Sequence, residues 1–448
     1  MPTEKIITQE YLRDFLLRDF DFHNHSSNYS THNFHSFPAK FPPQLPKSFI
    51  SEFTNEGEIV LDPMVGSGTT ILEAFMLGRK SIGFDIDPLA ILISRVKTTH
   101  LETSILLEEY KEVQRIAKLE FSNRPKLIND MELYFDFETK EFINNWFLLS
   151  TQYELFALIK AINTVENEDI RNFFKVAFSS TIITKSGGVS LALDLGHTRP
   201  HLAKKAIGPD GTIVYGSSET STPKYLEKNI RSAFREFEKR CENNFRSVLP
   251  SNTKFESPIV QFGNSQNMPI DHESVDLIVS SPPYASNAID YMRAHKFSLV
   301  WMGYSISDLS QKRKSYIGSE ATDGYALLNL PEYPEIIINR VDIKDKKRGK
   351  VLRRYFTEMH YVLSEFFRVL KPGKLAVLVV GNTVIREVDT ETAFCLSEIG
   401  KSIGFSVPAI GTRQLDRNKR MLPAGNTRIE DSKIQQRMHE EFILGFLK

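Results

Sequence analysis

The fold is decided by one short stretch, Leu61-Asp62-Pro63-Met64-Val65-Gly66-Ser67-Gly68-Thr69-Thr70. The stretch 58–61, which is apolar from Ile59 onward, predicts a buried strand, and the pattern 69–77 predicts a helix that Gly78 ends. The two glycines between them let the backbone approach a ligand closely, and the start of a helix offers free N–H groups. We therefore expect a ligand-binding turn where the strand ends.

The residues of this turn exclude two common ligand-binding patterns. Ile71 stands where a dinucleotide fingerprint needs its third glycine, and no lysine follows the glycines as it would in a phosphate-binding loop. Asp62 at the strand tip suits a cationic group, such as the methionine ammonium of S-adenosylmethionine. The alternative is a plain strand-to-helix turn.

Two further strand ends carry polar side chains. The run 80–85 predicts a strand that ends in Asp85, and an acid at this place typically bonds ribose hydroxyls in nucleotide-binding sheets. The alternative is a helix cap, a role that Asp87-Pro88 can also fill. Asn264 follows the predicted strand 258–262 and is a candidate partner for an adenine amino group, or a residue of an ordinary turn.

The most specific motif is Ser280-Ser281-Pro282-Pro283-Tyr284, which directly follows the predicted strand 275–279. Two consecutive prolines fix φ twice and remove two N–H donors, so carbonyl oxygens are left without competing donors. The Pro282 carbonyl and the Ser281 hydroxyl can accept the hydrogens of an exocyclic amine, which aims the nitrogen lone pair at a methyl donor. Tyr284 offers a flat face for stacking. The alternative is a rigid turn.

With these motifs the chain resembles the DNA amino-methyltransferases, which share an Asp-Pro-x-x-Gly-x-Gly cofactor turn and a Ser/Asp/Asn-Pro-Pro-Tyr catalytic turn. The serine form resembles the cytosine-N4 enzymes of restriction–modification systems. The segment from Phe34 to Pro46 resembles the one that closes over the methionine end of the cofactor in that family. The resemblance covers residues 30–100, 258–304 and 355–448.

The resemblance implies an α/β fold, namely the seven-stranded Rossmann-like methyltransferase sheet with its last strand antiparallel and with a large, mainly helical insertion. It implies site-specific methylation of cytosine N4 in double-stranded DNA and leaves room for a cognate restriction endonuclease. The implied catalytic residues are Ser281, Pro282, Pro283 and Tyr284. The cofactor is S-adenosylmethionine, and the residues expected to bind it are Phe34, Lys40, Asp62, Pro63, Gly66, Ser67, Gly68, Thr69, Asp85 and Asn264.

Several other functions stay open. Adenine carries the same arrangement of amine and ring nitrogen as cytosine, so the choice of cytosine rests on the serine of the catalytic turn. An RNA base or a protein glutamine amide also presents a planar amine, and a non-catalytic DNA-binding specificity protein is the alternative from another class. A carbon-5 cytosine mechanism needs a thiolate, and neither Cys241 nor Cys395 sits at a strand end beside proline.

The rhythm of strands and helices divides the chain into five segments. Residues 1–100 hold the N-terminal segment and the cofactor half, and 101–257 form a mainly helical insertion that is the candidate for target recognition. Residues 258–304 carry the catalytic turn, 305–354 form a basic insertion loop, and 355–448 complete the catalytic sheet. A helix is expected from 355 to 370, followed by a central strand and a last strand at 441–446.

The overall charge does not indicate a polyanionic partner, because 56 Lys and Arg balance 56 Asp and Glu. Local clusters are therefore the candidates for phosphate contact, although such clusters are often solvated faces. Four histidines, His23, His25, His32 and His35, lack the spacing of a metal site, and we expect no metal. No apolar run spans a membrane and no signal peptide is evident, so we expect a cytoplasmic protein. The candidate nucleic-acid contacts are Lys312, Arg313, Lys314, Lys346, Lys347, Arg348, Arg413, Arg417 and Arg420.

Overall fold

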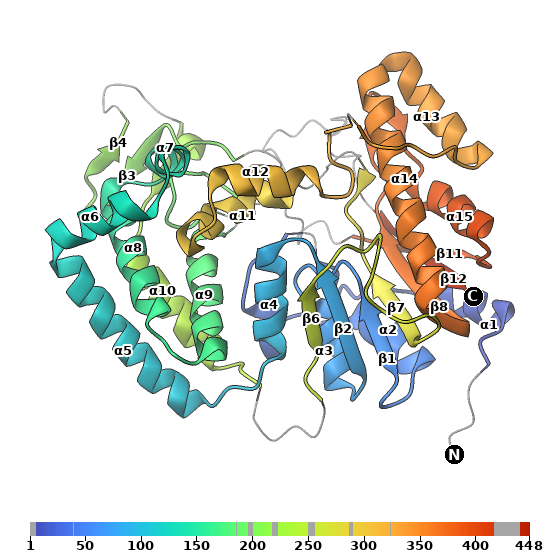
Figure 1. Cartoon of the computed structure of the whole chain (residues 1–448), viewed down its shortest axis with the longest axis horizontal. Coiled ribbons are helices and arrows are strands. Elements are labelled where there is room, and N and C mark those ends of the chain that lie inside the picture. Colours follow the sequence, from blue (N-terminus) through green and yellow to red (C-terminus); the bar gives the residue numbers. More distant parts are fainter. Residues whose placement is uncertain are drawn as a thin grey trace.

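A computed structural model of the chain describes residues 6–38, 40–184, 186–195, 200–216, 223–249, 256–285, 290–322, 324–415 and 440–448. Its centre is a seven-stranded sheet in the order β11-β12-β8-β7-β1-β2-β6 (Figure 1). The strands are β1 (Ile59–Asp62), β2 (Lys80–Asp85), β6 (Ile259–Phe262), β7 (Val275–Ser280), β8 (Leu370–Val380), β11 (Ile410–Gln414) and β12 (Glu440–Leu447). Strand β12 is antiparallel to both of its neighbours, and the other pairings are parallel, which confirms the predicted sheet.

Both faces of the sheet are covered by helices because successive residues of each strand point to opposite sides. Val60 and Val377 pack on the face covered by the N-terminal helices, whereas Leu61 and Leu378 pack on the face covered by the C-terminal ones. The first face carries α1 (Gln9–Leu16), α2 (Gln44–Phe53), α3 (Thr69–Met76) and α4 (Pro88–Thr98). The second carries α14 (Lys346–Val369) and α15 (Thr392–Ile403).

The insertion after α4 is mainly helical, as predicted, and it forms a lobe beside α4 (Figure 1). Its helices are α5 (Thr103–Ser122), α6 (Arg124–Tyr134), α7 (Phe137–Trp146), α8 (Leu149–Asn163), α9 (Glu168–Ile182) and α10 (Ala233–Phe245). One apolar core runs from α4 through this helical lobe and includes Phe173 and Trp301, so the lobe is packed rigidly against the cofactor half. The chain leaves and re-enters the cofactor half side by side, because His100 and Leu249 form a parallel bridge.

A small three-stranded sheet at the edge of the helical lobe was not expected. Its strands are β3 (Lys205–Ile207), β4 (Ile213–Tyr215) and β5 (Glu227–Asn229). Strands of three residues are too short to show the alternation of apolar and polar residues by which a sequence predicts strands.

The prediction of a basic insertion loop over 305–354 was wrong, because these residues are largely helical. They contain α12 (Ile306–Lys314), α13 (Glu332–Lys344) and the first turns of α14. Asp345 caps α14 by accepting a hydrogen bond from the Arg348 N–H at 3.1 Å. Gly349 permits the close packing of α13 on α14, since a Cβ there would lie 1.6 Å from Asp342 Oδ1. The many lysines and arginines favour a helix as readily as a loop.

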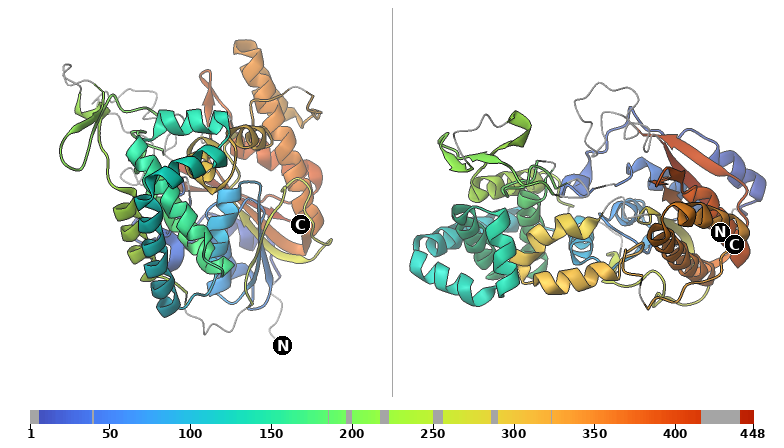
Figure 2. Two further views of the ribbon diagram at one scale, coloured as in Figure 1. Left: turned by 60° about the vertical axis from the view of Figure 1, so that its left-hand side comes forward. Right: turned by 90° about the horizontal axis from the view of Figure 1, so that it is seen from above.

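Seen from above, the helical lobe and the α13–α14 pair lie on opposite sides of the cofactor half (Figure 2). The remaining elements are α11 (Tyr291–Leu299), which follows the catalytic turn, and the short pair β9 (Val384–Ile385) and β10 (Val388–Asp389). Among the helices of the described ranges, none combines the length and the apolar character that a membrane span requires.

Candidate active site

The predicted cofactor turn lies between the end of β1 and the start of α3. Gly66 and Gly68 adopt φ angles of 47° and 74°, which non-glycine residues rarely adopt. A Cβ on Gly68 would also lie 2.8 Å from Ser94 Oγ of α4, so the turn needs glycine for space as well as for conformation. The Gly66 N–H donates to Asp85 Oδ2 at 2.9 Å, which ties the turn to the end of β2.

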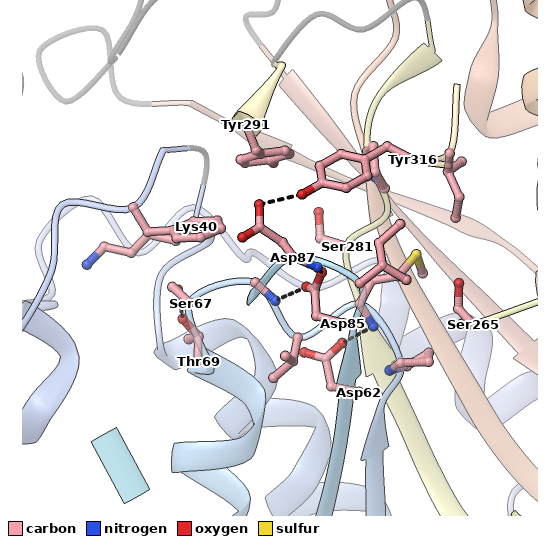
Figure 3. Close-up of a pocket in the computed structure, with 18 of the residues that line it drawn as sticks. Lys40, Asp62, Ser67, Thr69, Asp85, Asp87, Ser265, Ser281, Tyr291 and Tyr316 are labelled. Atoms are coloured by element: carbon pink, nitrogen blue, oxygen red, sulfur yellow. Dashed lines mark hydrogen bonds between the residues drawn. The ribbon is translucent and has the colours of Figure 1, made fainter. Parts of the chain in front are cut away.

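Two strand-end carboxylates, Asp62 and Asp85, face the cavity above this turn (Figure 3). Burial raises the pKa of Asp62 to about 6, although hydrogen bonds from Ser280 and the Met64 N–H oppose the rise. Burial and the neighbouring Asp87 raise the pKa of Asp85 to about 7. The site therefore favours a cationic ligand, because a positive charge bound beside these two carboxyls would stabilise their ionised forms.

A third carboxylate, Asp87, caps α4, which was one of the roles predicted for it. It also lines the cavity and contacts His295 and Tyr316 from later in the chain. Its Oδ1 accepts from the Leu89 N–H at 2.8 Å. Its Oδ2 accepts from the Tyr316 hydroxyl at 2.8 Å and lies 2.7 Å from His295 Nδ1. Burial raises the pKa of Asp87, but the facing His295 and its hydrogen bonds outweigh burial, so the pKa lies below its ordinary value. Asp87 therefore stays ionised at a lower pH than Asp85 does.

The cavity gathers most of the predicted cofactor residues at the carboxyl edge of β1, β2 and β6. Those that line it are Lys40, Asp62, Pro63, Gly66, Ser67, Thr69, Asp85 and Asn264. From the catalytic turn, Ser281 and Pro283 line the same cavity. Gly68, Pro282 and Tyr284 are not among the lining residues, although each is next in sequence to one that is.

Phe34 lies elsewhere than predicted. Its ring is buried in the core of the helical lobe, 5.7 Å from that of Phe173, where an apolar side chain finds more partners than at a solvated cavity. Phe37, three residues later, lines the cavity instead and stacks on Tyr291 at 5.4 Å. Lys40 donates to the His32 carbonyl at 2.9 Å, a hydrogen bond within the N-terminal segment itself.

Sequence reasoning missed five aromatic or acidic residues of the wall, namely Phe37, Phe41, Asp87, Tyr291 and Tyr316. Asp87 was noted only as a helix cap, and Tyr291 only as part of a stretch that resembles the family. Tyr316 comes from the segment that was predicted to be a loop, and a lone tyrosine there carries no signal. The contact with Asp87 that brings it to the cavity is visible only in three dimensions.

The catalytic turn leaves β7 at the same edge of the sheet. Ser280 donates from Oγ to Asp62 Oδ1 at 2.7 Å, and Ser281 donates from Oγ to the Val379 carbonyl of β8 at 2.9 Å. Tyr284 donates from its hydroxyl to Glu441 Oε1 at 2.7 Å. The turn is thus fixed to both neighbouring strands and to the cofactor side, so its position relative to the cavity is well determined.

The predicted basic contacts divide into paired and exposed groups. Arg313 pairs with Asp290 and Arg348 pairs with Glu320, while Arg413 is buried beside Glu441. Lys312 lies over the Phe262 ring. The exposed candidates are Lys314, Lys346 and Lys347. Arg417 and Arg420 lie outside the described residues. No group of three metal-ligating side chains occurs within the described ranges.

The comparisons with known proteins agree with this geometry. Residues 7–95 match the family model described as DNA methylase, of the N6 and N4 type. The chain is 25% identical over 408 residues to the Type II methyltransferase M.MvaI of Kocuria varians, which covers 85% of this chain and 83% of the relative. It is 26% identical over 426 residues to the Type II methyltransferase M.BsoBI of Geobacillus stearothermophilus, covering 85% and 79%. A solved methyltransferase from Methanosarcina mazei aligns over 89% of this chain and 96% of its own at 10% identity, with a TM-score of 0.30 that is too low to bear on the fold.

The sheet order, with β12 antiparallel, and the cavity at its carboxyl edge are those expected from the resemblance to S-adenosylmethionine-dependent amino-methyltransferases. Its cavity fits that cofactor, since strand-end carboxylates face a ligand that carries a sulfonium and an ammonium, and aromatic side chains offer flat faces for adenine. The chain thus matches the DNA methylase family model over residues 7–95 and is similar along most of its length to Type II methyltransferases.

Proposed function

We propose that the chain transfers the methyl group of S-adenosylmethionine to the N4 amino group of cytosine at specific sites in DNA. The observation that carries this proposal is that Ser281 and Pro283 line the same cavity as Asp62 and Asp85. An amine held by the catalytic turn would therefore meet a methyl donor held by the strand-end carboxylates. Placing two reactants in line at short distance is the main source of rate for such a transfer.

The cofactor would be held by residues from three strand ends. Asp85 would accept hydrogen bonds from the ribose hydroxyls, Asp62 would face the methionine ammonium, and Asn264 would lie near the adenine amino group. When bound, S-adenosylmethionine supplies an electrophilic methyl group on a sulfonium. The ring pair of Phe37 and Tyr291 would shield this region from water.

The catalytic turn would hold the amine through oxygen acceptors. Because the Ser281 hydroxyl already donates its hydrogen to Val379, its lone pairs remain to accept a hydrogen from the amine. The Pro282 carbonyl would accept the second hydrogen. The nitrogen lone pair would then attack the methyl carbon as the carbon–sulfur bond breaks, and the nitrogen would lose one proton to solvent.

The choice of cytosine rests on Ser281, which matches the serine form of the family's catalytic turn. Cytosine and adenine both place a ring-nitrogen acceptor beside the amine, so the local chemistry does not favour either base. Mass spectrometry of nucleosides from DNA methylated by the purified chain should detect N4-methylcytosine. N6-methyladenine as the sole product would refute the cytosine assignment.

DNA as the substrate is supported by exposed cations that no carboxylate of the described residues neutralises. Lys346 and Lys347 lie at the start of α14, beside the end of α13, where Ile343 is 86% exposed. On the other side of the cofactor half, the helical lobe carries the small sheet, and Tyr225, in the turn just before β5, is 76% exposed. We infer that this lobe reads the target sequence while the lysines contact phosphates.

S-adenosylmethionine with a labelled methyl group distinguishes DNA methylation from RNA methylation and from DNA binding without catalysis. We expect methyl transfer to duplex DNA and none to tRNA. Transfer to tRNA but not to duplex DNA would overturn the DNA assignment, and DNA binding without transfer to any acceptor would favour a non-catalytic specificity protein.

A further inference from the structure

The hydroxyl of Tyr284 is anchored by a residue far away in sequence. It donates to Glu441 Oε1 at 2.7 Å, and the Glu441 side chain is only 12% exposed. Burial, together with this carboxylate, raises the pKa of Tyr284 well above its ordinary value. The tyrosine therefore stays protonated and keeps donating, so the link between the catalytic turn and β12 persists over the working pH range.

The carboxylate has a buried partner on the neighbouring strand. Arg413 of β11 is the register partner of Glu441, and its Nη1 lies 3.4 Å from Glu441 Oε2. Its side chain is 7% exposed, which removes it from the set of phosphate contacts predicted from sequence. A buried carboxylate needs a nearby cation to offset the cost of desolvation, and Arg413 supplies that charge.

The end of β11 is itself tied to the N-terminal segment. The Gln414 N–H donates to Asp21 Oδ1 at 2.6 Å, and His23 Nε2 bonds the Gln414 carbonyl at 2.9 Å. Arg413 therefore projects from backbone that is held on both sides, and Glu441 projects from a strand paired on both edges. The acceptor of the tyrosine hydroxyl is part of the rigid sheet rather than of a loop.

We propose that Glu441, backed by Arg413, is the positioning residue for Tyr284 and fixes the plane of the ring against which the target base stacks. This inference rests on the proposed function, because a flipped base is what the ring would receive. A tyrosine on a turn has several ring orientations, and a fixed acceptor for its hydroxyl selects one. Neither Glu441 nor Arg413 lines the cofactor cavity, so the effect falls on turnover and not on cofactor affinity.

The test compares single-turnover methyl transfer to plasmid DNA by the full-length chain and its variants. Glu441→Gln and Tyr284→Phe should each lower the rate about tenfold, the effect of losing one charge-assisted hydrogen bond. The dissociation constant of S-adenosylmethionine should stay within about twofold in both variants. The double variant should be no slower than Tyr284→Phe alone, because the removed hydroxyl leaves the carboxylate nothing to position.

Glu440→Gln is the matched control, since it removes a neighbouring carboxylate of the same strand that faces away from Tyr284, and its rate should equal that of the wild type. Thermal unfolding establishes that each variant is folded. The proposal is overturned if Glu441→Gln slows the reaction equally in the Tyr284→Phe background, which would mean a general structural role. It is also overturned if Glu441→Gln matches Glu440→Gln. Failure of the wild type to methylate DNA would instead refute the proposed function.

Discussion

Cofactor affinity should depend on pH through Asp85, and the structure sets the size of the effect. The pKa of this carboxyl is raised to about 7 by burial and by the neighbouring Asp87. A cationic cofactor whose ribose donates hydrogen bonds binds the ionised form. At pH 5, two units below that pKa, about one molecule in 100 is ionised at this position, so affinity should fall about 100-fold from its value at pH 8. Asp62, with a pKa of about 6, should add about tenfold.

Isothermal titration of S-adenosylmethionine into the chain from pH 5 to pH 8 measures this dependence. The Asp85→Asn variant should bind more weakly at pH 8 and retain only the roughly tenfold dependence that Asp62 contributes. Circular dichroism at each pH establishes that the chain remains folded. A variant that keeps the full dependence of the wild type, or a wild type whose affinity is flat from pH 5 to pH 8, would refute the reasoning.

Three further predictions concern the turns and the basic surface. Gly68→Ala should lower the free energy of unfolding in urea by about 3 kcal/mol, because the new Cβ adds a clash to a left-handed φ. Gly57→Ala, which has only the φ penalty, should lower it by about 1 kcal/mol. Equal decreases for the two variants would contradict the close packing of Gly68 on α4. Pro282→Ala should lower kcat about tenfold with an unchanged KM for S-adenosylmethionine, and a change confined to KM would argue against its role in holding the amine. Replacing Lys346 and Lys347 together by alanine should reduce the slope of log affinity for DNA against log salt by about 2 in fluorescence anisotropy, and an unchanged slope would place the phosphates elsewhere.

The sheet and the two turns were predictable because each depends on local sequence. Apolar runs of strand length gave β1, β2 and β7 almost to the residue, and the glycines and prolines marked the turns that follow. The sequence pattern also predicted β12 as a strand, but its antiparallel direction came from the family resemblance, since strand direction leaves no trace in hydrophobicity.

The parts that escaped prediction depend on contacts between distant segments. Charge alone suggested that Arg413 binds phosphate, yet its register with Glu441 buries it beside the catalytic turn. Tyr316 reaches the cavity through Asp87, which lies 229 positions earlier. The helices of 305–354 were hidden because basic residues on their exposed faces resemble a solvated loop.

The bridge between His100 and Leu249 has a consequence for how such chains change over evolutionary time. The Leu101 N–H donates to the Leu249 carbonyl at 3.3 Å, so the two ends of the helical lobe lie side by side where the chain leaves and re-enters the cofactor half. Because these ends are adjacent, insertions, deletions or replacements within the helical lobe need not move any strand of the sheet. The freedom is limited by packing, because the buried Trp301 contacts the lobe's Phe135 and Phe147. We therefore expect the helical lobe and the segment after the catalytic turn to be exchanged together. Recombination that replaced only one of them would leave a cavity around Trp301.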